Sequence, residues 1–136
     1  YFMDLGLRNA RINFRQYERS HLMENAVYNE MRARGFSVDV GAVPTLGMMP
    51  DGSRHRAVLE VDFVCNLGSK RYYIQSAYRM ESEDKVRQER VSLLKLDDSF
   101  KKIIVIGEEC PVTRDEMGIT TMGIYDFLLN KNSLDL

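Results

Sequence analysis

Several features that would direct the search for a function are missing from this chain. No run approaches the ~20 continuous apolar residues that a membrane-spanning helix requires, and no segment reads as a secretory signal peptide. The two cysteines, Cys65 and Cys110, have no metal-ligand spacing. These absences predict a cytoplasmic domain with reduced thiols and no membrane partner.

The common nucleotide-binding loops are also missing. Neither G-x-x-x-x-G-K-[ST] nor G-x-G-x-x-G occurs, so the chain does not bind nucleotide through a loop of that kind. The net charge is −1, which argues against a protein whose main work is to coat nucleic acid. The sequence begins at Tyr1 without an initiator methionine, and we expect a fragment of a longer polypeptide.

What is present indicates one domain of ordinary size, since 136 residues can bury a core. Apolar residues recur at helical spacing between Ser20, a good N-cap, and Gly35, a good helix stop, which predicts a helix over 21–34. Residues 36–40 read as a strand, and residues 44–53 read as a turn-rich stretch.

Two later strands, 57–65 and 71–78, are joined by a short turn at 66–69 and predict an antiparallel hairpin. The near-continuous apolar run 102–106 is typical of a central strand covered on both faces. Further elements are expected at 7–17 (helix), 82–94 (helix), 119–124 (strand) and 126–129 (helix). This order predicts an α/β fold in which helices flank a mixed central sheet.

Acidic residues interrupt the apolar pattern. Glu60 and Asp62 share one face of their strand, and burying them is costly unless a cation meets them. Glu24 lies on or beside the apolar stripe of the 21–34 helix, which is unusual for a surface acid. Such acids are typical of a metal-dependent nuclease site. Alternatively, Glu60 and Asp62 pair across the hairpin with one of four cations: Arg54, Arg56, Lys70 or Arg71.

Four arginines near the start form a second pattern: Arg8, Arg11, Arg15 and Arg19. Their spacings of three, four and four place them in one basic stripe if the segment is helical. The stripe could contact nucleic-acid phosphates or a neighbouring domain, or it could be a solvated face.

The element order and these residues resemble the restriction-endonuclease-like, PD-(D/E)XK superfamily. More narrowly, the chain resembles the C-terminal domain of unknown function that is attached to prokaryotic AAA-type ATP-binding proteins. The resemblance spans nearly the whole chain, and its Glu-Val-Asp-Phe-Val segment is fairly specific. The residues that carry it are 2, 4–8, 21–25, 60–64 and 73–77.

The resemblance implies roles for individual residues. Glu24 matches the family's helix acid and Asp62 its strand aspartate, while Gln75 stands in place of the second strand acid and Ala77 in place of the lysine. Asp62, Gln75 and Glu60 would then be the ligands of a Mg²⁺ or Mn²⁺ ion. Losing one transition-state stabiliser such as that lysine typically lowers the rate by about 10²–10³.

Three functions follow from this. In the first, residues 20–136 are a catalytically inactive, nuclease-like domain, and residues 1–19 link it to an upstream ATPase module. It would recognise a partner or nucleic acid. In the second, the chain is a weak metal-dependent DNA endonuclease using Glu24, Asp62 and Gln75, with a lysine from Lys70 or Lys85. The third is a protein-interaction module without a nucleic-acid role.

Overall fold

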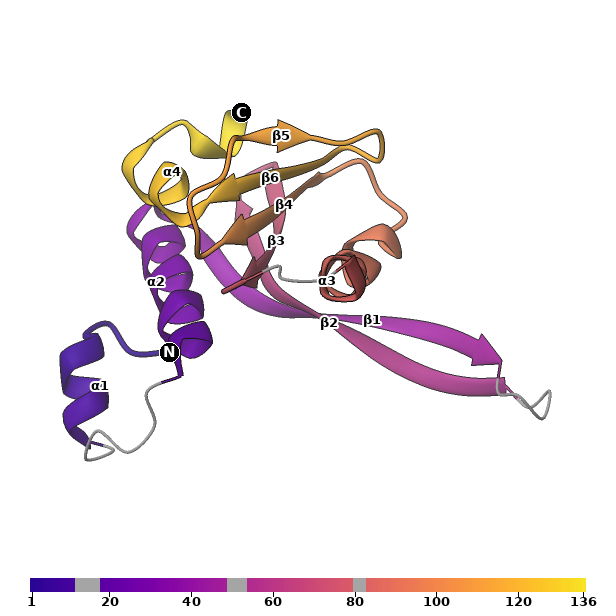
Figure 1. Cartoon of the computed structure of the whole chain (residues 1–136), viewed down its shortest axis with the longest axis horizontal. Coiled ribbons are helices and arrows are strands. Elements are labelled where there is room, and N and C mark those ends of the chain that lie inside the picture. Colours follow the sequence, from indigo (N-terminus) through magenta and orange to yellow (C-terminus); the bar gives the residue numbers. More distant parts are fainter. Residues whose placement is uncertain (12–17, 49–53, 80–82) are drawn as a thin grey trace.

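A computed structural model describes residues 1–11, 18–48, 54–79 and 83–136 of the chain. The elements are, in chain order, α1 (Leu5–Arg11), α2 (Arg19–Ala33), β1 (Ser37–Met48), β2 (Arg54–Leu67), β3 (Lys70–Ala77), α3 (Glu83–Leu94), β4 (Lys101–Ile106), β5 (Thr113–Arg114), β6 (Ile119–Gly123), α4 (Ile124–Leu129) and a 3-10 helix, η1 (Ser133–Asp135) (Figure 1).

The strands form one six-stranded mixed sheet in the order β1-β2-β3-β4-β6-β5. Strand β2 runs antiparallel to both of its neighbours, β1 and β3, whereas β4 runs parallel to both β3 and β6. The α3 helix supplies the crossover that a parallel β3–β4 connection requires. The predicted class, an α/β fold with helices flanking a mixed sheet, is confirmed.

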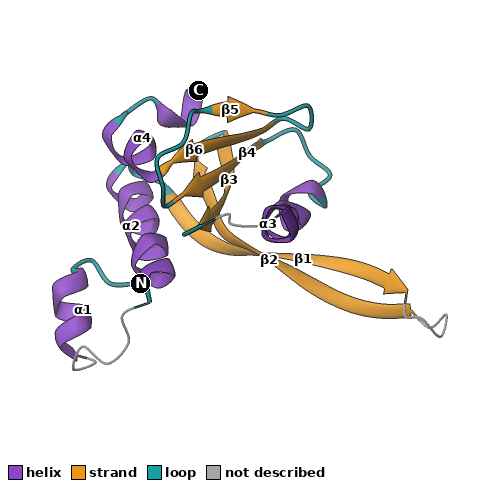
Figure 2. Cartoon of the chain, viewed as in Figure 1, coloured by secondary structure: helices purple, strands orange, loops and turns teal. Residues whose placement is uncertain are grey.

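Helices cover both faces of the sheet (Figure 2). Ile103 of β4 packs in a core with residues of α2 and α4, such as Val27 and Phe127. Its neighbour Ile104 packs on the opposite face with Leu93 of α3. Adjacent strand residues point to opposite faces, so the apolar run in β4 supplies two cores at once. The prediction of a doubly covered central strand is therefore confirmed.

The first long helix ends where the sequence predicts and begins earlier. Gly35 follows α2 with a φ of +90°, a left-handed conformation that glycine adopts without strain. At the other end the N-cap is Glu18 rather than Ser20, and its side chain makes no capping hydrogen bond. The Ser20 prediction is wrong because the helix already includes Arg19.

The turn predicted over 44–53 is also wrong in its first half, because β1 continues through Pro44 to Met48. Proline removes one backbone donor, but β1 lies at the edge of the sheet, where a strand bonds on one side only. Residues 49–53 lie outside the described part of the chain.

The β1–β2 hairpin extends beyond the rest of the sheet as a two-stranded ribbon (Figure 1). Pairing between β2 and β3 stops at Phe63 opposite Ile74, whereas β1 and β2 stay paired out to Met48 opposite Arg54. Asp62 is therefore the residue at which β2 leaves β3. This divergence sets the geometry of the candidate site.

The four arginines do not form one stripe. Arg8 and Arg11 lie in α1, Arg15 lies outside the described residues, and Arg19 opens α2. The backbone of Glu18 is extended, so the helix is broken before Arg19. Arg19 instead donates a hydrogen bond of 2.8 Å to the hydroxyl of Tyr78. The prediction of a continuous basic helix face is wrong.

Candidate functional site

Asp62 lies at a β-bulge. Asp39 faces Val64 and Gly41 faces Val61, so β2 carries one residue more than β1 between these pairs. Val61 packs in the α3-side core, while Phe63 packs in the α2-side core although it is only two residues further on. The bulge thus interrupts the alternation of the strand and changes the direction of the Asp62 side chain.

The carboxylate of Asp62 is held by β3. Its Oδ2 atom accepts hydrogen bonds from the backbone N–H of Ser76 (2.7 Å) and from the hydroxyl of Ser76 (3.0 Å). Its Oδ1 atom accepts a hydrogen bond of 3.0 Å from the side-chain amide of Gln75. Both carboxylate oxygens are therefore occupied by donors from the neighbouring strand.

Gln75 completes an exchange of hydrogen bonds with Asp62. Its Oε1 atom accepts the backbone N–H of Asp62 at 3.3 Å, and its Nε2 atom also donates to Glu89 of α3 at 3.1 Å. The two side chains thus satisfy backbone donors at the point where the strands diverge. The amide nitrogen of Gln75 lies between two carboxylates, and it joins α3 to the sheet.

Glu24 reaches the same region from α2. Its side chain is 27% exposed, and its pKa is raised above the usual range by burial and by the nearby charge of Asp62. The pKa of Asp62 is also raised, mainly by burial, although the hydrogen bonds from Ser76 and Gln75 act in the opposite direction. The structure therefore brings Glu24 and Asp62 within electrostatic range of each other.

Tyr1 lies near these two acids. Its ring stacks on Tyr28 at 4.5 Å and packs against Phe63 at 5.4 Å between centroids. Its pKa is raised to about 12 by burial and by the charges of Glu24 and Asp62. The main chain of the next residue, Phe2, is clasped by the side chain of Asn25, which accepts its N–H and donates to its oxygen. The start of the described chain is thus packed against α2, near Glu24 and Asp62.

Among the side chains that the structure describes, the other residues that the sequence offered for the site supply neither a further metal ligand beside Asp62 nor the missing lysine. The side chain of Glu60 is exposed, and its charge acts on Asp62 only by raising its pKa. Ala77 is 3% exposed and provides no cation. Lys70 lies five residues before Gln75 on the extended β3, about 16 Å away. It cannot replace the missing lysine. The side chain of Lys85 lies outside the described part of the chain.

These residues do not fit a Mg²⁺ or Mn²⁺ ion as they stand. Such an ion needs oxygen ligands with free lone pairs in octahedral geometry. The Asp62 oxygens already accept three hydrogen bonds, and Gln75 presents its NH₂ group, not its oxygen, toward the carboxylates of Asp62 and Glu89. Within the described ranges, no group of three or more His, Cys, Asp or Glu side chains could hold a metal ion.

Sequence reasoning missed three members of this site: Tyr1, Ser76 and Glu89. Glu89 could have been found, because in the helix predicted over 82–94 it shares one face with the apolar residues Val86 and Leu93. Ser76 and Tyr1 carried no such signal. Their roles depend on the bulge at Asp62 and on how the N-terminal segment packs against α2.

Comparison with known proteins adds one relative. The chain is 28% identical over 129 residues to a Haemophilus influenzae protein that is described as uncharacterized. The alignment covers 95% of this chain and 28% of that protein, so the chain spans less than a third of the length of this curated relative. No protein-family model matches the chain, and no solved structure matches it. Among the described residues, no helix is long and apolar enough to cross a membrane.

Proposed function

We propose that this chain is a nuclease-like domain of a longer ATP-binding protein of the AAA type, and that it recognises a partner or nucleic acid without cleaving it. The observation that carries the proposal is the state of Asp62. Both of its oxygens accept hydrogen bonds from Ser76 and Gln75, which leaves a carboxylate that organises the strands in place of one that holds a metal.

Two further observations support nuclease ancestry. The acid Glu24 lies on the helix before the sheet, Asp62 on the second strand, and Gln75 and Ala77 on the third, as the resemblance to the PD-(D/E)XK superfamily implies. The electrostatic coupling of Glu24 and Asp62 is what a shared ancestral pocket would retain. The greater length of the relative is compatible with a domain inside a larger protein.

The alternative is a weak metal-dependent endonuclease, and the proximity of Glu24 and Asp62 favours it. A nicking assay separates the two functions. Wild-type chain and Asp62→Ala are incubated with supercoiled plasmid and Mn²⁺. We expect no difference in nicking between them, since the site lacks a free metal ligand set and a lysine at position 77. Nicking by the wild type that disappears in Asp62→Ala would establish the endonuclease instead.

A further inference from the structure

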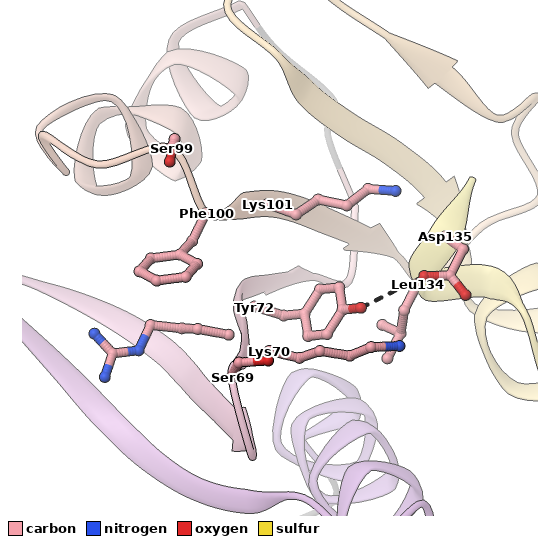
Figure 3. Close-up of a pocket in the computed structure, with 9 residues that line it drawn as sticks. Ser69, Lys70, Tyr72, Ser99, Phe100, Lys101, Leu134 and Asp135 are labelled. Carbon is pink, nitrogen blue, oxygen red and sulfur yellow. Dashed lines mark hydrogen bonds between the residues drawn. The ribbon is translucent and has the colours of Figure 1, made fainter.

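Cations gather at the amino ends of β3 and β4, the end of β3 away from Asp62. Lys70 and Tyr72 share one face of β3 because side chains alternate along a strand. Lys101 pairs with Tyr72 in the parallel register and lies on that same face. Figure 3 shows Lys70 and Lys101 on either side of the Tyr72 ring, with both ammonium groups extending toward the side of Asp135.

Two neighbouring clefts open around Tyr72. One has a volume of about 280 Å³ and the other of about 420 Å³, and both are lined by Lys70, Tyr72, Leu134 and Asp135. Lys131 also lines the larger one. We call the two together the basic cleft. It is continuous over the amino ends of the strands, beside η1.

Most of the positive charge in the basic cleft is unpaired. Arg34, which also lines it, is neutralised by Glu30 at 2.8 Å. Three other cations that line it have no carboxylate within 4.0 Å among the described residues: Lys70, Arg71 and Lys131. Arg114 lines neither cleft but acts on Lys101 from β5. Asp135 is the acid that lines both clefts, and it accepts a 3.5 Å hydrogen bond from Tyr72. Cations therefore outnumber acids here, in a chain whose net charge is −1.

Arg114 on β5 acts electrostatically on Lys101. The pKa of Lys101 is lowered by burial and by the charge of Arg114, although the charge of Asp135 acts in the opposite direction. The ammonium group of Lys101 donates to the main-chain oxygen of Leu136, the last described residue. An anion bound between Lys101 and Arg114 would relieve the repulsion between them.

An aromatic ring lies on the other side of the smaller cleft from the ammonium groups of Lys70 and Lys101 (Figure 3). Phe100 lines the smaller cleft and is 40% exposed, and the guanidinium group of Arg71 lies 5.3 Å from the centre of its ring. A free phosphate ion would use only the cations. A nucleotide would use both, because an exposed aromatic ring beside cations offers a stacking surface for a base.

We infer that the basic cleft binds a single-stranded nucleic-acid segment, with its phosphates against Lys70, Lys101 and Arg114 and one base stacked on Phe100. The inference rests on the recognition role proposed above and specifies the ligand class. It does not depend on Glu24 or Asp62. Failure to bind would therefore leave the result of the nicking assay unaffected.

Fluorescence anisotropy with a short, labelled oligothymidylate tests the inference, using the full 136-residue chain. We expect saturable binding that weakens as salt rises, with a slope that falls by about 0.7 for each phosphate contact removed. Lys70→Glu/Arg114→Glu should lower the affinity by at least about tenfold. Phe100→Ala should lower it about 5- to 100-fold while the salt slope stays unchanged, because it removes stacking but no charge.

Arg87→Glu is the control, since Arg87 is exposed on α3 and its substitution changes the net charge by −2 away from the cleft, the same as Lys70→Glu alone and half the change in Lys70→Glu/Arg114→Glu. It should bind the oligonucleotide within about twofold of the wild type after correction for net charge. Equal losses in Arg87→Glu and in Lys70→Glu/Arg114→Glu would overturn the inference. So would equal binding by Phe100→Ala and wild type, or binding of inorganic pyrophosphate without binding of the oligonucleotide. Circular dichroism of each variant confirms that it is folded.

Discussion

At its carboxyl end, β3 places Gln75 and Ser76 against Asp62, and every polar atom of that carboxylate finds a donor inside the protein. At its amino end, the same strand carries Lys70, whose ammonium group meets no carboxylate among the described residues. Groups that satisfy each other hold a fold together. Charges left unpaired at a concave surface are available to a ligand. Residues that look catalytic from the sequence therefore act in the fold, while unremarkable lysines form the better candidate for binding.

The largest effect expected from this comparison is on stability. Asp62→Ala removes the acceptor of the Ser76 N–H and of the Gln75 amide and should lower the free energy of unfolding by about 1–3 kcal/mol. Asp62→Asn keeps an oxygen that can accept the hydrogen bond from Ser76, so it should lower the free energy of unfolding by less. Urea unfolding followed by circular dichroism measures both changes.

Lys70→Ala, at the other end of β3, is the matched control for Asp62→Ala. Lys70 is exposed and should change the free energy of unfolding by no more than about 0.5 kcal/mol. If Asp62→Ala changed the free energy of unfolding as little as Lys70→Ala does, or raised it, Asp62 would not be a structural residue.

A smaller effect is expected at Glu24, and it depends on pH. Folding raises the pKa of Glu24 above 4.5, so the folded state binds the proton more tightly than the unfolded state does. The resulting stability is fully present below about pH 4.5 and is lost as the pH rises through the raised pKa. Glu24→Gln should therefore match the wild type at low pH and be more stable near neutrality, by on the order of 0.5 kcal/mol.

Thermal unfolding of wild type and Glu24→Gln across this pH range measures the difference. His21, which lies 3.6 Å from Glu24 and acts to lower its pKa, should be tested as His21→Ala, where the gain from Glu24→Gln becomes larger. A gain that is present at low pH and vanishes at neutral pH would show that the repulsion between Glu24 and Asp62 is wrongly assigned.

Much of the fold follows from local patterns in the sequence. The apolar run of β4 predicted a strand covered on both faces, and Gly35 predicted the end of α2, because each depends on residues close together in the chain. Pro44 led to the wrong prediction of a turn. The energetic cost of proline in a strand is small at the edge of a sheet, and only the complete sheet shows that β1 is an edge strand. The two-residue β5 carried no pattern strong enough to predict it.

The site was harder to predict than the fold. The sequence correctly indicated that Asp62 and Gln75 share one neighbourhood, and the structure joins them by hydrogen bonds. The sequence could not show that Asp62 accepts the backbone N–H of Ser76, because this depends on the bulge in the β1–β2 pair and on the end of β2–β3 pairing at Phe63. The basic cleft combines residues from β3, β4 and η1, and no spacing in the sequence relates them.

The state of Asp62 can be tested directly by adding Mn²⁺ to the ¹⁵N-labelled chain and recording the broadening of its backbone amide signals, since a bound paramagnetic ion broadens nearby resonances. We expect the signals of Asp62, Gln75 and Ser76 to broaden no more than those of residues of comparable exposure elsewhere in the sheet. Selective broadening at these three residues that is lost in Asp62→Asn would contradict this expectation, and would show that a metal ion displaces the hydrogen bonds that hold the two strands.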